Sequence, residues 1–537
     1  MTAHSLKAAP VLVVGAGIMG AGIAQVAAQA GHNVLLHDVR QGAAADAKAR
    51  LGKTFEGLAA KGKLKPEDAV AALAQVEPVT SLGAAAGVGL VVEAIVEQLD
   101  AKRSLFAQLE TIVAPSCVLA TNTSSISVTA IASGLLRPQR LVGMHFFNPV
   151  PLMKLVEVVS GLHTDPAVAN AIFELSQQWG KVPVHAKSTP GFIVNRIARP
   201  YYAEALALLQ EQATTPEVLD ACLRGAGFRM GPCELMDLIG HDTNFAVTKS
   251  VYEANFYDKR YVPSLVQREM VDGGMLGRKS GRGFFDYSAS AAPKPAPLSL
   301  EAVPLPAATH LRVHGRGAVA ERLSRALAHA GRAFVRDSSS EFVGLTIDGA
   351  QLRMSDGACA SELGAEVAVF DLPNVSPSNP SLSSPGVPNP SVSIGAEPGT
   401  PLAWAPSVRA SASWADAAPI WLRALGADPQ RVADTPGLVV ARTIAMLINE
   451  AADAVQQGVC TPEGADAAMK LGVNYPAGPF EWLARWDVGA VLGVLEALDR
   501  SYRGERYRVS PWLRRQAALA QGNTTVTQRS GASGSAR

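Results

Sequence analysis

The chain has 537 residues, of which 48% are hydrophobic and 18% charged, and its formal net charge is +1. These values describe a globular protein of several domains and give no reason to expect nucleic acid as a partner. The five cysteines have neither CxxC nor Cys/His ligand spacing, so we expect no disulfide and no metal site. We find no signal-peptide pattern and no apolar run that could cross a bilayer, so we expect a cytoplasmic protein without a membrane partner.

The N-terminal end has the pattern of a dinucleotide-binding βαβ unit. An apolar run, VLVV, precedes Gly15-x-Gly17-x-x-Gly20, a helix follows, and a second strand ends at Asp38. The three glycines permit a tight turn, a close approach of the backbone to a pyrophosphate, and close packing of helix on strand. Asp38 would bind ribose hydroxyls and repel a 2′-phosphate, which favours NAD over NADP, although Arg40 weakens that preference.

Two further predicted strands carry polar groups where they end. The strand at 90–92 leads to a loop with Glu93 and Glu97, and a helix begins near Asp100. The next strand, VLATNTSS, ends in a cluster of hydroxyls and amides at 121–125. Ligands of open α/β sheets bind at the carboxyl ends of the strands, so we expect a ligand here.

His145 and Glu157 stand twelve residues apart in MHFFNPVPLMKLVEV, on either side of a turn built on Asn148, Pro149 and Pro151. The alternation in LVEVV predicts a strand with the carboxylate on one face. An imidazole held against a carboxylate is a base whose tautomer its partner sets. Most His/Glu neighbours are structural or solvated pairs, so the interpretation as a catalytic pair depends on the flanking motifs.

Six motifs occur in one order across residues 11–287: GAGIMGAGIAQ, VVEAIVEQLDAK, TNTSS, MHFFNPVPLMKLVEVV, STPGFIVNR and LGRKSGRGFFDY. In this combination the chain resembles the L-3-hydroxyacyl-CoA dehydrogenases. The resemblance implies an NAD-dependent oxidation of an L-3-hydroxyacyl-CoA to the 3-oxoacyl-CoA, with an acyl-CoA thioester as the small-molecule partner.

The resemblance also assigns roles to particular residues. His145 would be the general base, Glu157 would orient it, and Ser124 and Asn195 would hold the substrate oxygens. The residues that would bind the cofactor are Gly15, Gly17, Ile18, Met19, Gly20, Asp38, Glu97, Lys102 and Asn148. The residues that would bind coenzyme A are Thr54, Lys61 and Ser124; by themselves, Thr54 and Lys61 look like surface residues of a basic helix.

The predicted fold class is α/β plus all-α, and a repeat of that arrangement follows. A Rossmann dinucleotide-binding domain at 8–188 precedes a helical domain at 189–287, whose first helix we expect to run unbroken through PGFIVNRIARPYYAEALALLQEQ. An Ala/Pro linker at 288–308 follows. Then come a degenerate Rossmann-like domain at 309–425, a second helical domain at 430–515 and a disordered tail at 522–537.

The repeat is visible in matched motifs. The pattern Gly315-x-Gly317-x-x-Ala320 mirrors the first glycine turn, and TPGLVVAR mirrors TPGFIVNR. However, Ala441 replaces Asn195, and nothing between 309 and 430 matches HFFNPVP or its glutamate; a Ser/Pro/Gly-rich stretch at 374–401, expected to be mobile, stands there instead. We therefore expect a non-catalytic copy that packs on the first in cis as a pseudo-dimer. Homo-oligomerisation is the alternative.

The sequence does not separate two substrates, of which we favour 3-hydroxyadipyl-CoA over 3-hydroxybutyryl-CoA. Chains of this type in the family oxidise 3-hydroxyadipyl-CoA in the degradation of aromatic acids such as phenylacetate, or 3-hydroxybutyryl-CoA in fatty-acid or butanoate metabolism. A second carboxylate would require a further cation, for which Arg196, Arg199 and Arg229 are candidates. An NAD-binding structural protein and a dehydrogenase of free 3-hydroxy acids or sugar acids are two other hypotheses; the intact catalytic set argues against the first, and Lys61 with the TNTSS and HFFNPVP motifs argues against the second.

Overall fold

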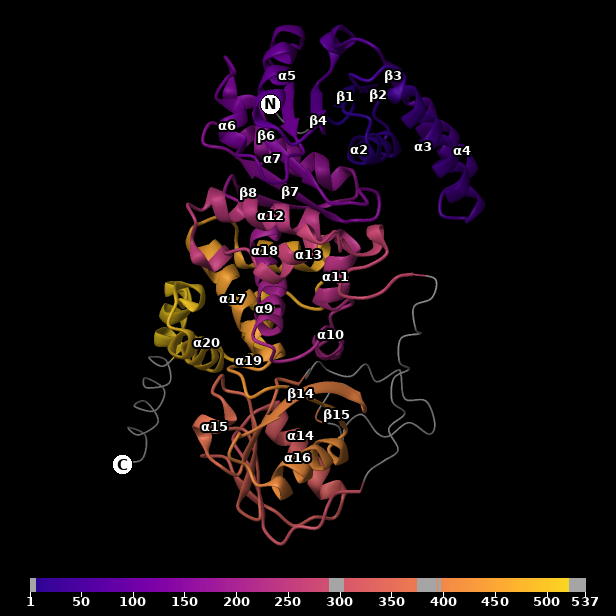
Figure 1. The fold of residues 1–537 in the computed structure, drawn as a ribbon. Helices are drawn as coiled ribbons and strands as arrows, with labels where there is room; N and C mark the ends of the chain where they lie inside the picture. Colours follow the sequence, from indigo (N-terminus) through magenta and orange to yellow (C-terminus); the bar gives the residue numbers. More distant parts are fainter. Residues whose placement is uncertain (1–5, 289–303, 374–393, 395–396, 521–537) are drawn as a thin grey trace, which may run out of the picture. The chain divides into compact units, whose positions relative to one another are not determined.

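The structure is a computed structural model that describes residues 6–288, 304–373, 394 and 397–520 (Figure 1). The chain divides into two compact units. The first contains the chain up to Ile197 together with Ala454–Gly478, and the second contains Ala198–Asp453 and the chain from Pro479 onward. Most of the predicted linker, all of the predicted tail and most of the Ser/Pro/Gly-rich stretch lie outside the described residues. The domain limits at which we divided the sequence stay predictions.

An eight-stranded sheet forms the centre of the first unit, in the order β3-β2-β1-β4-β5-β6-β7-β8. All neighbouring strands are parallel except β6 and β7. The inner strands are buried on both faces, as expected of parallel strands that helices cover on both sides. The strands are β1 (Val11–Val14), β2 (Val34–His37), β3 (Val76–Val79), β4 (Leu90–Glu93), β5 (Val118–Thr121), β6 (Leu141–Phe146), β7 (Leu155–Ser160) and β8 (Val182–Lys187).

Helices lie on both faces of this sheet. Four of them share one apolar core with the sheet: α2 (Ile18–Gln29), α3 (Ala43–Ala60), α4 (Pro66–Ala74) and α7 (Pro166–Gln178). The crossover from β4 to β5 runs in the opposite direction along the sheet from that between β1 and β2, so right-handed connections place α5 (Leu99–Ile112) on the other face. The sheet with its helices is a Rossmann-type fold, as predicted. The remaining elements before β7 are η1 (Leu82–Gly87), α6 (Val128–Ala132) and η2 (Pro138–Arg140).

A helix from the second half of the sequence belongs to this first unit. α18 (Pro462–Gly472) packs against β7, β8 and the short helix α8 (Val194–Ile197). Just before α18, the carbonyl of Val459 accepts the backbone N–H of Lys187 at 3.0 Å, which continues the pairing beyond β8. Ala454–Gly478, a segment of the second copy, therefore belongs to the same compact unit as the sheet that carries His145 and Glu157.

The prediction of one unbroken helix after the TPGF motif is wrong. α8 ends at Ile197, and a new helix, α9 (Arg199–Gln210), begins two residues later. Pro200 occupies the first turn of α9. It has no N–H to donate, and its ring would clash with the carbonyl four residues back, so the helix has to restart. The two units divide at this point in the chain.

The second unit contains helices from both copies. The first copy contributes α9, α10 (Pro216–Gly225), α11 (Pro232–Ile239), α12 (His241–Ala254), η3 (Lys259–Tyr261), α13 (Leu265–Asp272) and η4 (Arg278–Ser280). The second contributes most of α17 (Val440–Gln456) and also α19 (Pro479–Trp486), α20 (Val488–Tyr502) and η7 (Glu505–Tyr507). Proline stands in the first turn of α10 and α11, where its missing N–H costs no hydrogen bond.

The same unit holds a second sheet, in the order β10-β9-β11-β12-β13-β14-β15. It keeps the βαβ start of a dinucleotide fold but departs from it at β11, which is antiparallel to both neighbours. The turn residues Asp348 and Gly349 have φ values of 47° and 95°, so an Asp-Gly hairpin replaces a helical crossover. The elements are β9 (Leu311–His314), α14 (Ala318–His329), β10 (Val335–Asp337), β11 (Gly344–Ile347), β12 (Ala350–Met354), α15 (Ala360–Leu363), β13 (Val367–Phe370), β14 (Thr400–Pro406), α16 (Ala412–Ala424) and β15 (Ala427–Arg431).

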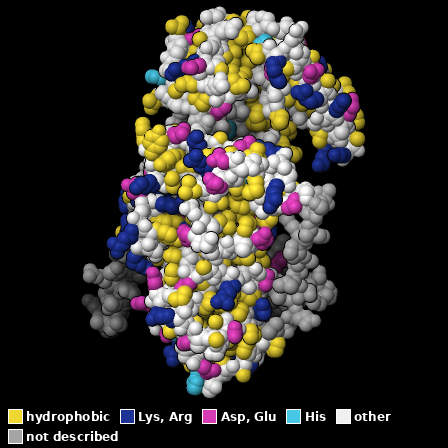
Figure 2. Space-filling view, viewed as in Figure 1, with side chains coloured by type: hydrophobic (Ala, Val, Ile, Leu, Met, Phe, Trp, Pro, Cys, Tyr) yellow, Lys and Arg dark blue, Asp and Glu magenta, His cyan; other side chains and the backbone are white. Residues whose placement is uncertain are grey.

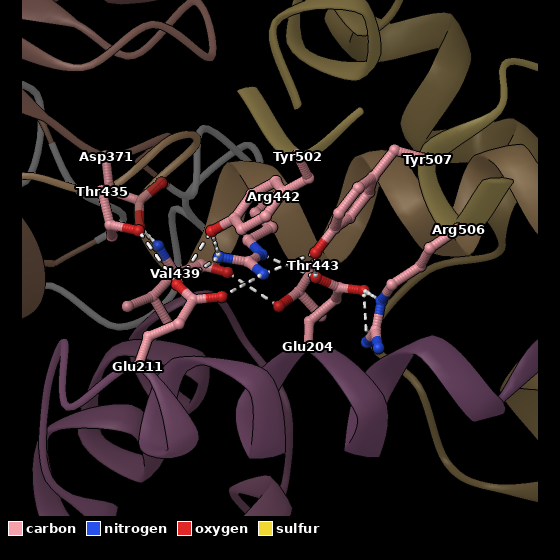
Figure 3. A network of polar contacts seen from close by, with 10 residues as sticks. All are labelled: Glu204, Glu211, Asp371, Thr435, Val439, Arg442, Thr443, Tyr502, Arg506 and Tyr507. Carbon is pink, nitrogen blue, oxygen red and sulfur yellow. Dashed lines mark hydrogen bonds and ion pairs between the residues drawn. The ribbon is translucent and has the colours of Figure 1, made fainter. Parts of the chain in front are cut away.

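A buried polar network joins the two helical copies inside the second unit (Figure 3). Glu204 on α9 receives Arg442 Nε of α17 at 2.6 Å, Arg506 Nη2 at 2.9 Å and the Tyr507 hydroxyl at 3.0 Å. Glu204 and Arg442 are completely buried. Burial by itself would raise the pKa of Glu204, but the two guanidinium groups hold it below its usual range.

The same arrangement recurs with the two copies exchanged. Glu450, 246 positions after Glu204, receives the Tyr261 hydroxyl at 2.6 Å and Arg260 Nη1 at 3.3 Å. Arg260 and Tyr261 precede Arg506 and Tyr507 by the same offset. The predicted repeat therefore has a physical counterpart, because each copy supplies the cations that neutralise a buried glutamate of the other.

Basic side chains are concentrated over part of the first unit, where Figure 2 shows several Lys and Arg side chains over α3 and α4. Among the residues that the structure describes, no helix is both long enough and apolar enough to span a membrane.

Candidate active site

His145 and Glu157 form a buried pair across the β6–β7 hairpin, where they are directly opposite each other in the register. His145 Nδ1 lies 2.6 Å from Glu157 Oε2, and Glu157 is completely buried. A carboxylate can only accept, so Nδ1 carries the proton and Nε2 keeps its lone pair. Among the described residues, we find no hydrogen bond to Nε2. The pair can therefore act as a base whose tautomer Glu157 determines.

The other oxygen of Glu157 is held by the TPGFIVNR turn. Glu157 Oε1 accepts the backbone N–H groups of Ile193 at 3.1 Å and Val194 at 2.9 Å. The imidazole lies between two aromatic rings, with ring centroids 4.5 Å away for Phe147 and 5.9 Å away for Phe192. These four residues restrict both the carboxylate and the ring to one orientation.

The TNTSS loop is organised around Glu97. One carboxylate oxygen, Oε1, accepts the Thr123 hydroxyl at 2.7 Å, the Ser124 N–H at 2.9 Å and the Ser125 N–H at 3.1 Å. The Ser124 hydroxyl is also within 3.3 Å of the same oxygen. Glu97 therefore fixes the position of the serine that we expect at the substrate.

Lys102 lies behind this loop rather than on the surface. It is 1% exposed, and its Nζ is 2.6 Å from Glu93 Oε1 and 3.1 Å from Glu97 Oε2. Burial opposes the ionisation of Glu97, but Lys102 and the Thr123 hydroxyl hold its pKa below the usual range. Glu93, expected on the loop, is the last residue of β4. A direct contact of Lys102 with the cofactor stays a prediction.

Two asparagines connect the strand ends around the pair. The side chain of Asn122 accepts the Phe146 N–H at 2.8 Å, which holds β6 in extended form beyond the end of β5. Asn195 Nδ2 donates to the Ser124 carbonyl at 3.4 Å, so the TPGFIVNR turn and the TNTSS loop are in contact. The structure thus brings Ser124, Asn195, His145 and its partner to one edge of the sheet.

The glycine turn after β1 fits a bound dinucleotide. A Cβ on Gly15 would lie 2.4 Å from the Ala94 carbonyl oxygen, and one on Gly20 would lie 1.7 Å from the Gly15 carbonyl oxygen. Neither position tolerates a side chain, so the strand and helix α2 approach as closely as this turn requires. A Cβ on Gly17 would meet no other atom within 4 Å, so the N-terminus of α2 is open at this residue, where a pyrophosphate binds in such turns. Of the neighbouring predicted contacts, Ile18 is exposed and Met19 is half-buried.

Asp38 follows the end of β2 and accepts the Ala16 N–H at 2.8 Å, so it is held beside the turn. Arg40 also reaches it, with Nε 3.1 Å from Oδ1 and Nη2 3.2 Å from Oδ2. Burial would raise the pKa of Asp38, but the Arg40 side chain and the Ala16 N–H lower it to about 2. The Arg40 side chain is 70% exposed, and the contact of Asp38 with a ribose stays a prediction.

The remaining predicted contacts are exposed. Asn148 lies in the turn of the β6–β7 hairpin. In the same hairpin, the carbonyls of Val150 and Met153 accept hydrogen bonds from Lys181 Nζ. Burial and the nearby Lys154 lower the pKa of Lys181 to about 8. Thr54 and Lys61 are exposed seven residues apart at the end of α3, hence on one face about two turns apart.

The three arginines considered for a second carboxylate differ in their surroundings. Arg196 is buried, with Nη1 2.7 Å from Gln457 Oε1. Arg199 is buried, donates to the Thr248 hydroxyl at 3.1 Å and lines a cavity of about 80 Å³. Arg229 is exposed. Of the three, Arg199 is the one that is buried and also lines this cavity.

The second sheet carries a different pair at the corresponding positions. β14 pairs with β15 as β7 pairs with β8, and at an offset of 246 residues Ala403 corresponds to Glu157. Asp371, whose N–H donates to the Ala403 carbonyl at 2.9 Å, takes the place of His145. The Asp371 carboxylate accepts the N–H groups of Val439, Val440 and Ala441, and burial raises its pKa to about 6. At these two positions the second half therefore has the same turn but neither an imidazole nor a glutamate.

Sequence reasoning missed the residues that position the pair. These are the N–H donors Ile193 and Val194, the ring of Phe147, and Asn122 directly after β5. All of them lie in the motifs TPGFIVNR, HFFNPVP and TNTSS. A pattern of residue types does not show that a backbone N–H will reach a carboxylate 36 residues away.

Comparison with known proteins agrees with this geometry. The family description "3-hydroxyacyl-CoA dehydrogenase, NAD binding domain" matches residues 10–189, and "3-hydroxyacyl-CoA dehydrogenase, C-terminal domain" matches 191–287 and again 437–528. The chain is 42% identical over 95% of its length to the 3-hydroxyadipyl-CoA dehydrogenase of Escherichia coli strain K12, of which it covers 98%. It is 44% identical over 51% of its length to a probable 3-hydroxybutyryl-CoA dehydrogenase of Deinococcus radiodurans, of which it covers 99%.

A solved structure has the same architecture over almost the whole chain. It is the crystal structure of 3-hydroxybutyryl-CoA dehydrogenase from Escherichia coli K12, with a TM-score of 0.82 and 40% identity. The alignment covers 96% of this chain and all of that one. The matched NAD-binding domain contains the glycine turn and the His145–Glu157 pair. The chain therefore belongs to the 3-hydroxyacyl-CoA dehydrogenase family of NAD-dependent oxidoreductases.

Proposed function

We propose that the substrate is 3-hydroxyadipyl-CoA, oxidised to the 3-oxo thioester during degradation of aromatic acids. The observation that carries this proposal is the 42% identity to a protein named for that substrate, extending over 95% of the chain. The D. radiodurans relative named for 3-hydroxybutyryl-CoA matches only 51% of the chain. The alternative substrate is 3-hydroxybutyryl-CoA, because the solved structure that matches the whole chain carries that name.

In this proposal each site residue has its own role in the oxidation of the substrate alcohol. His145 Nε2 accepts the proton of the 3-hydroxyl, and Glu157 stabilises the imidazolium that forms. Ser124 and Asn195 donate to the substrate oxygen as it becomes a carbonyl. Bound NAD supplies the acceptor for the hydride that leaves C3.

The remaining predicted residues bind the two ligands. The N–H groups at the start of α2, next to Gly17, would hold the pyrophosphate, and Asp38 would hold the ribose. Thr54 and Lys61 would contact coenzyme A, for which the basic side chains over α3 and α4 in Figure 2 are a suitable surface for phosphate.

We propose one active site per chain, with the second copy in a structural role. Asp371 and Ala403 cannot replace an imidazole held by a carboxylate, because the four acceptor sites of the Asp371 carboxylate are already taken by the N–H groups of Leu372, Val439, Val440 and Ala441. The cation–glutamate network of Figure 3 supports a pseudo-dimer in cis in place of a symmetric homodimer of helical domains.

A kinetic comparison tests the proposed function. NADH formation is measured with 3-hydroxyadipyl-CoA, with 3-hydroxyhexanoyl-CoA, which has the same chain length but no second carboxylate, with 3-hydroxybutyryl-CoA and with a free 3-hydroxy acid. We expect kcat/KM to be about tenfold or more higher for the adipyl thioester, since one charge-assisted hydrogen bond is worth roughly 1.5–3 kcal/mol. Equal values for the two six-carbon thioesters would contradict the dicarboxylyl substrate, and turnover in His145→Gln would contradict the base.

A further inference from the structure

The last residue of α18 lies against the supports of the His145–Glu157 pair. A Cβ placed on Gly472 would lie 2.7 Å from Leu155 Cδ2, 3.0 Å from Val194 Cγ2 and 3.7 Å from Phe147 Cε1. Gly472 is buried, and α18 packs on β7 and α8 within the same compact unit as the pair. A side chain at this point of the second copy would therefore press on Leu155 and Val194 of the first copy, and its Cβ would meet Phe147 at ordinary van der Waals distance.

Each of these three residues has a direct connection to the catalytic pair. Val194 donates its N–H to Glu157 Oε1 at 2.9 Å. Leu155 stands two residues before Glu157 on β7, so both side chains lie on one face of the strand. The Phe147 ring is 4.5 Å from the imidazole, centroid to centroid. The contacts at Gly472 therefore converge on both members of the pair.

We propose that Gly472 is a positioning residue for the dehydrogenation. Its missing side chain lets the end of α18 pack directly on Val194, whereas a larger residue would displace Val194 and then press on Phe147, and through them on the carboxylate and the imidazole. This inference rests on the proposed roles of His145 and Glu157. It gives the non-catalytic copy a specific task, because the residue that completes the support of the pair comes from that copy.

The other half of the repeat provides an internal comparison. At the offset of 246 residues, Ala226 corresponds to Gly472, and it lines one small cavity together with Leu402, next to Ala403 of β14. A Cβ is accommodated there, where the strand carries alanine in place of the catalytic glutamate. In that half it is the preceding residue, Gly225, whose Cβ would come within 2.6 Å of the Pro401 carbonyl oxygen, so the position that requires glycine differs between the two copies.

A graded series at Gly472 tests the proposal, with a matched series at Gly464. Gly464 lies in the first turn of the same helix, and a Cβ there would come within 2.9 Å of Val184 Cγ1, away from Phe147. Alanine, valine and leucine are introduced at each position in the full-length chain. Melting temperature, NAD affinity, and the pH dependence of kcat and KM are measured with 3-hydroxybutyryl-CoA.

We expect kcat to fall by about threefold in Gly472→Ala and about 10- to 100-fold in Gly472→Leu, since displacing reacting groups by about 1 Å costs up to about a hundredfold. KM and NAD affinity should change by less than about threefold, and the acid limb of the kcat/KM profile should shift as the imidazole loses its fixed partner. The Gly464 variants should lose similar stability but keep kcat within about twofold. If the leucine variant does not fold, Gly472→Ala decides, because alanine favours a helix over glycine by about 1 kcal/mol.

Wild-type kcat and pH profile in folded Gly472 variants, together with an inactive His145→Gln, would overturn this inference and leave the proposed function intact. Equal losses of kcat in the Gly464 series would also overturn it, because the effect would then be one of general packing. Wild-type turnover in His145→Gln would overturn the proposed function and this inference with it.

Discussion

Replacing Glu157 with glutamine is the sharpest test of the catalytic pair, because it replaces one oxygen with an NH₂ group and leaves the volume almost unchanged. In the protein, one oxygen of Glu157 accepts from His145 Nδ1 and the other from the N–H groups of Ile193 and Val194. A glutamine has only one oxygen for these two tasks. If the oxygen faces the two N–H groups, the NH₂ faces Nδ1, and the imidazole proton is forced onto Nε2, where a base is required.

In the opposite orientation, the glutamine oxygen accepts from His145 Nδ1, which restores the tautomer with a free Nε2 but costs free energy. The NH₂ would then face two buried N–H donors and leave both unsatisfied, at about 1–3 kcal/mol each. A total of about 2–6 kcal/mol corresponds to a loss of about 30- to 10⁴-fold in kcat at 1.4 kcal/mol per factor of ten. The loss of charge beside the forming imidazolium adds to this.

The assay is steady-state NADH formation from 3-hydroxybutyryl-CoA, with NAD affinity and the melting temperature measured on the same preparation. Glu174→Gln, at an exposed position on α7, is the matched control and should behave as wild type. A folded Glu157→Gln variant whose kcat stays within about threefold of wild type would refute the reasoning, because the tautomer would then not depend on the carboxylate.

Three further outcomes follow from the contacts. Lys102→Met removes the cation that lowers the pKa of Glu97. In the wild type, the ionised Glu97 that holds the TNTSS loop is fully present above its ordinary pKa of 4.5 and is lost only as the pH falls through a lower value. The acid limb of the activity profile should therefore move to higher pH in the variant. Arg442→Met should lower the free energy of unfolding, measured in urea titrations, by about 3–5 kcal/mol. A double-mutant cycle with Glu204→Gln should give a coupling free energy of about 1 kcal/mol or more, and additive losses would show that the two residues are not coupled. Asp38→Ser should weaken NAD and bring the NAD and NADP affinities within about tenfold of each other, and an unchanged preference in fluorescence titrations would show that Asp38 does not select the cofactor.

Much of the site could be predicted because its signals are local. The glycine turn, the strand ends and the hairpin between His145 and Glu157 each involve residues close together in the chain. Their spacing follows from backbone geometry: a period of two on strands, a tight turn before a helix, and a hairpin that places two strands side by side. The family and the NAD cofactor could be inferred from these motifs for the same reason.

Sequence reasoning failed where a local turn or helix-start signal was present but was given less weight than the pattern around it. Pro200 inside an apolar periodic run indicates a helix restart, and the periodicity concealed it. The Asp348-Gly349 pair is a hairpin signal, and it marks where the second sheet departs from a dinucleotide fold.

What the amino-acid sequence determined by itself was the chemistry available: a dinucleotide turn, an imidazole with a carboxylate on adjacent strands, and a second copy that lacks both. Only the tertiary structure decided how that chemistry is held in place. The N–H groups on Glu157, the hydroxyl and N–H groups of the TNTSS loop on Glu97, the cations shared between the helical copies, and Gly472 beside Val194 all join segments far apart in the chain. Such contacts depend on how whole elements pack, because the spacing of residue types specifies a local backbone but not which distant segment lies beside it.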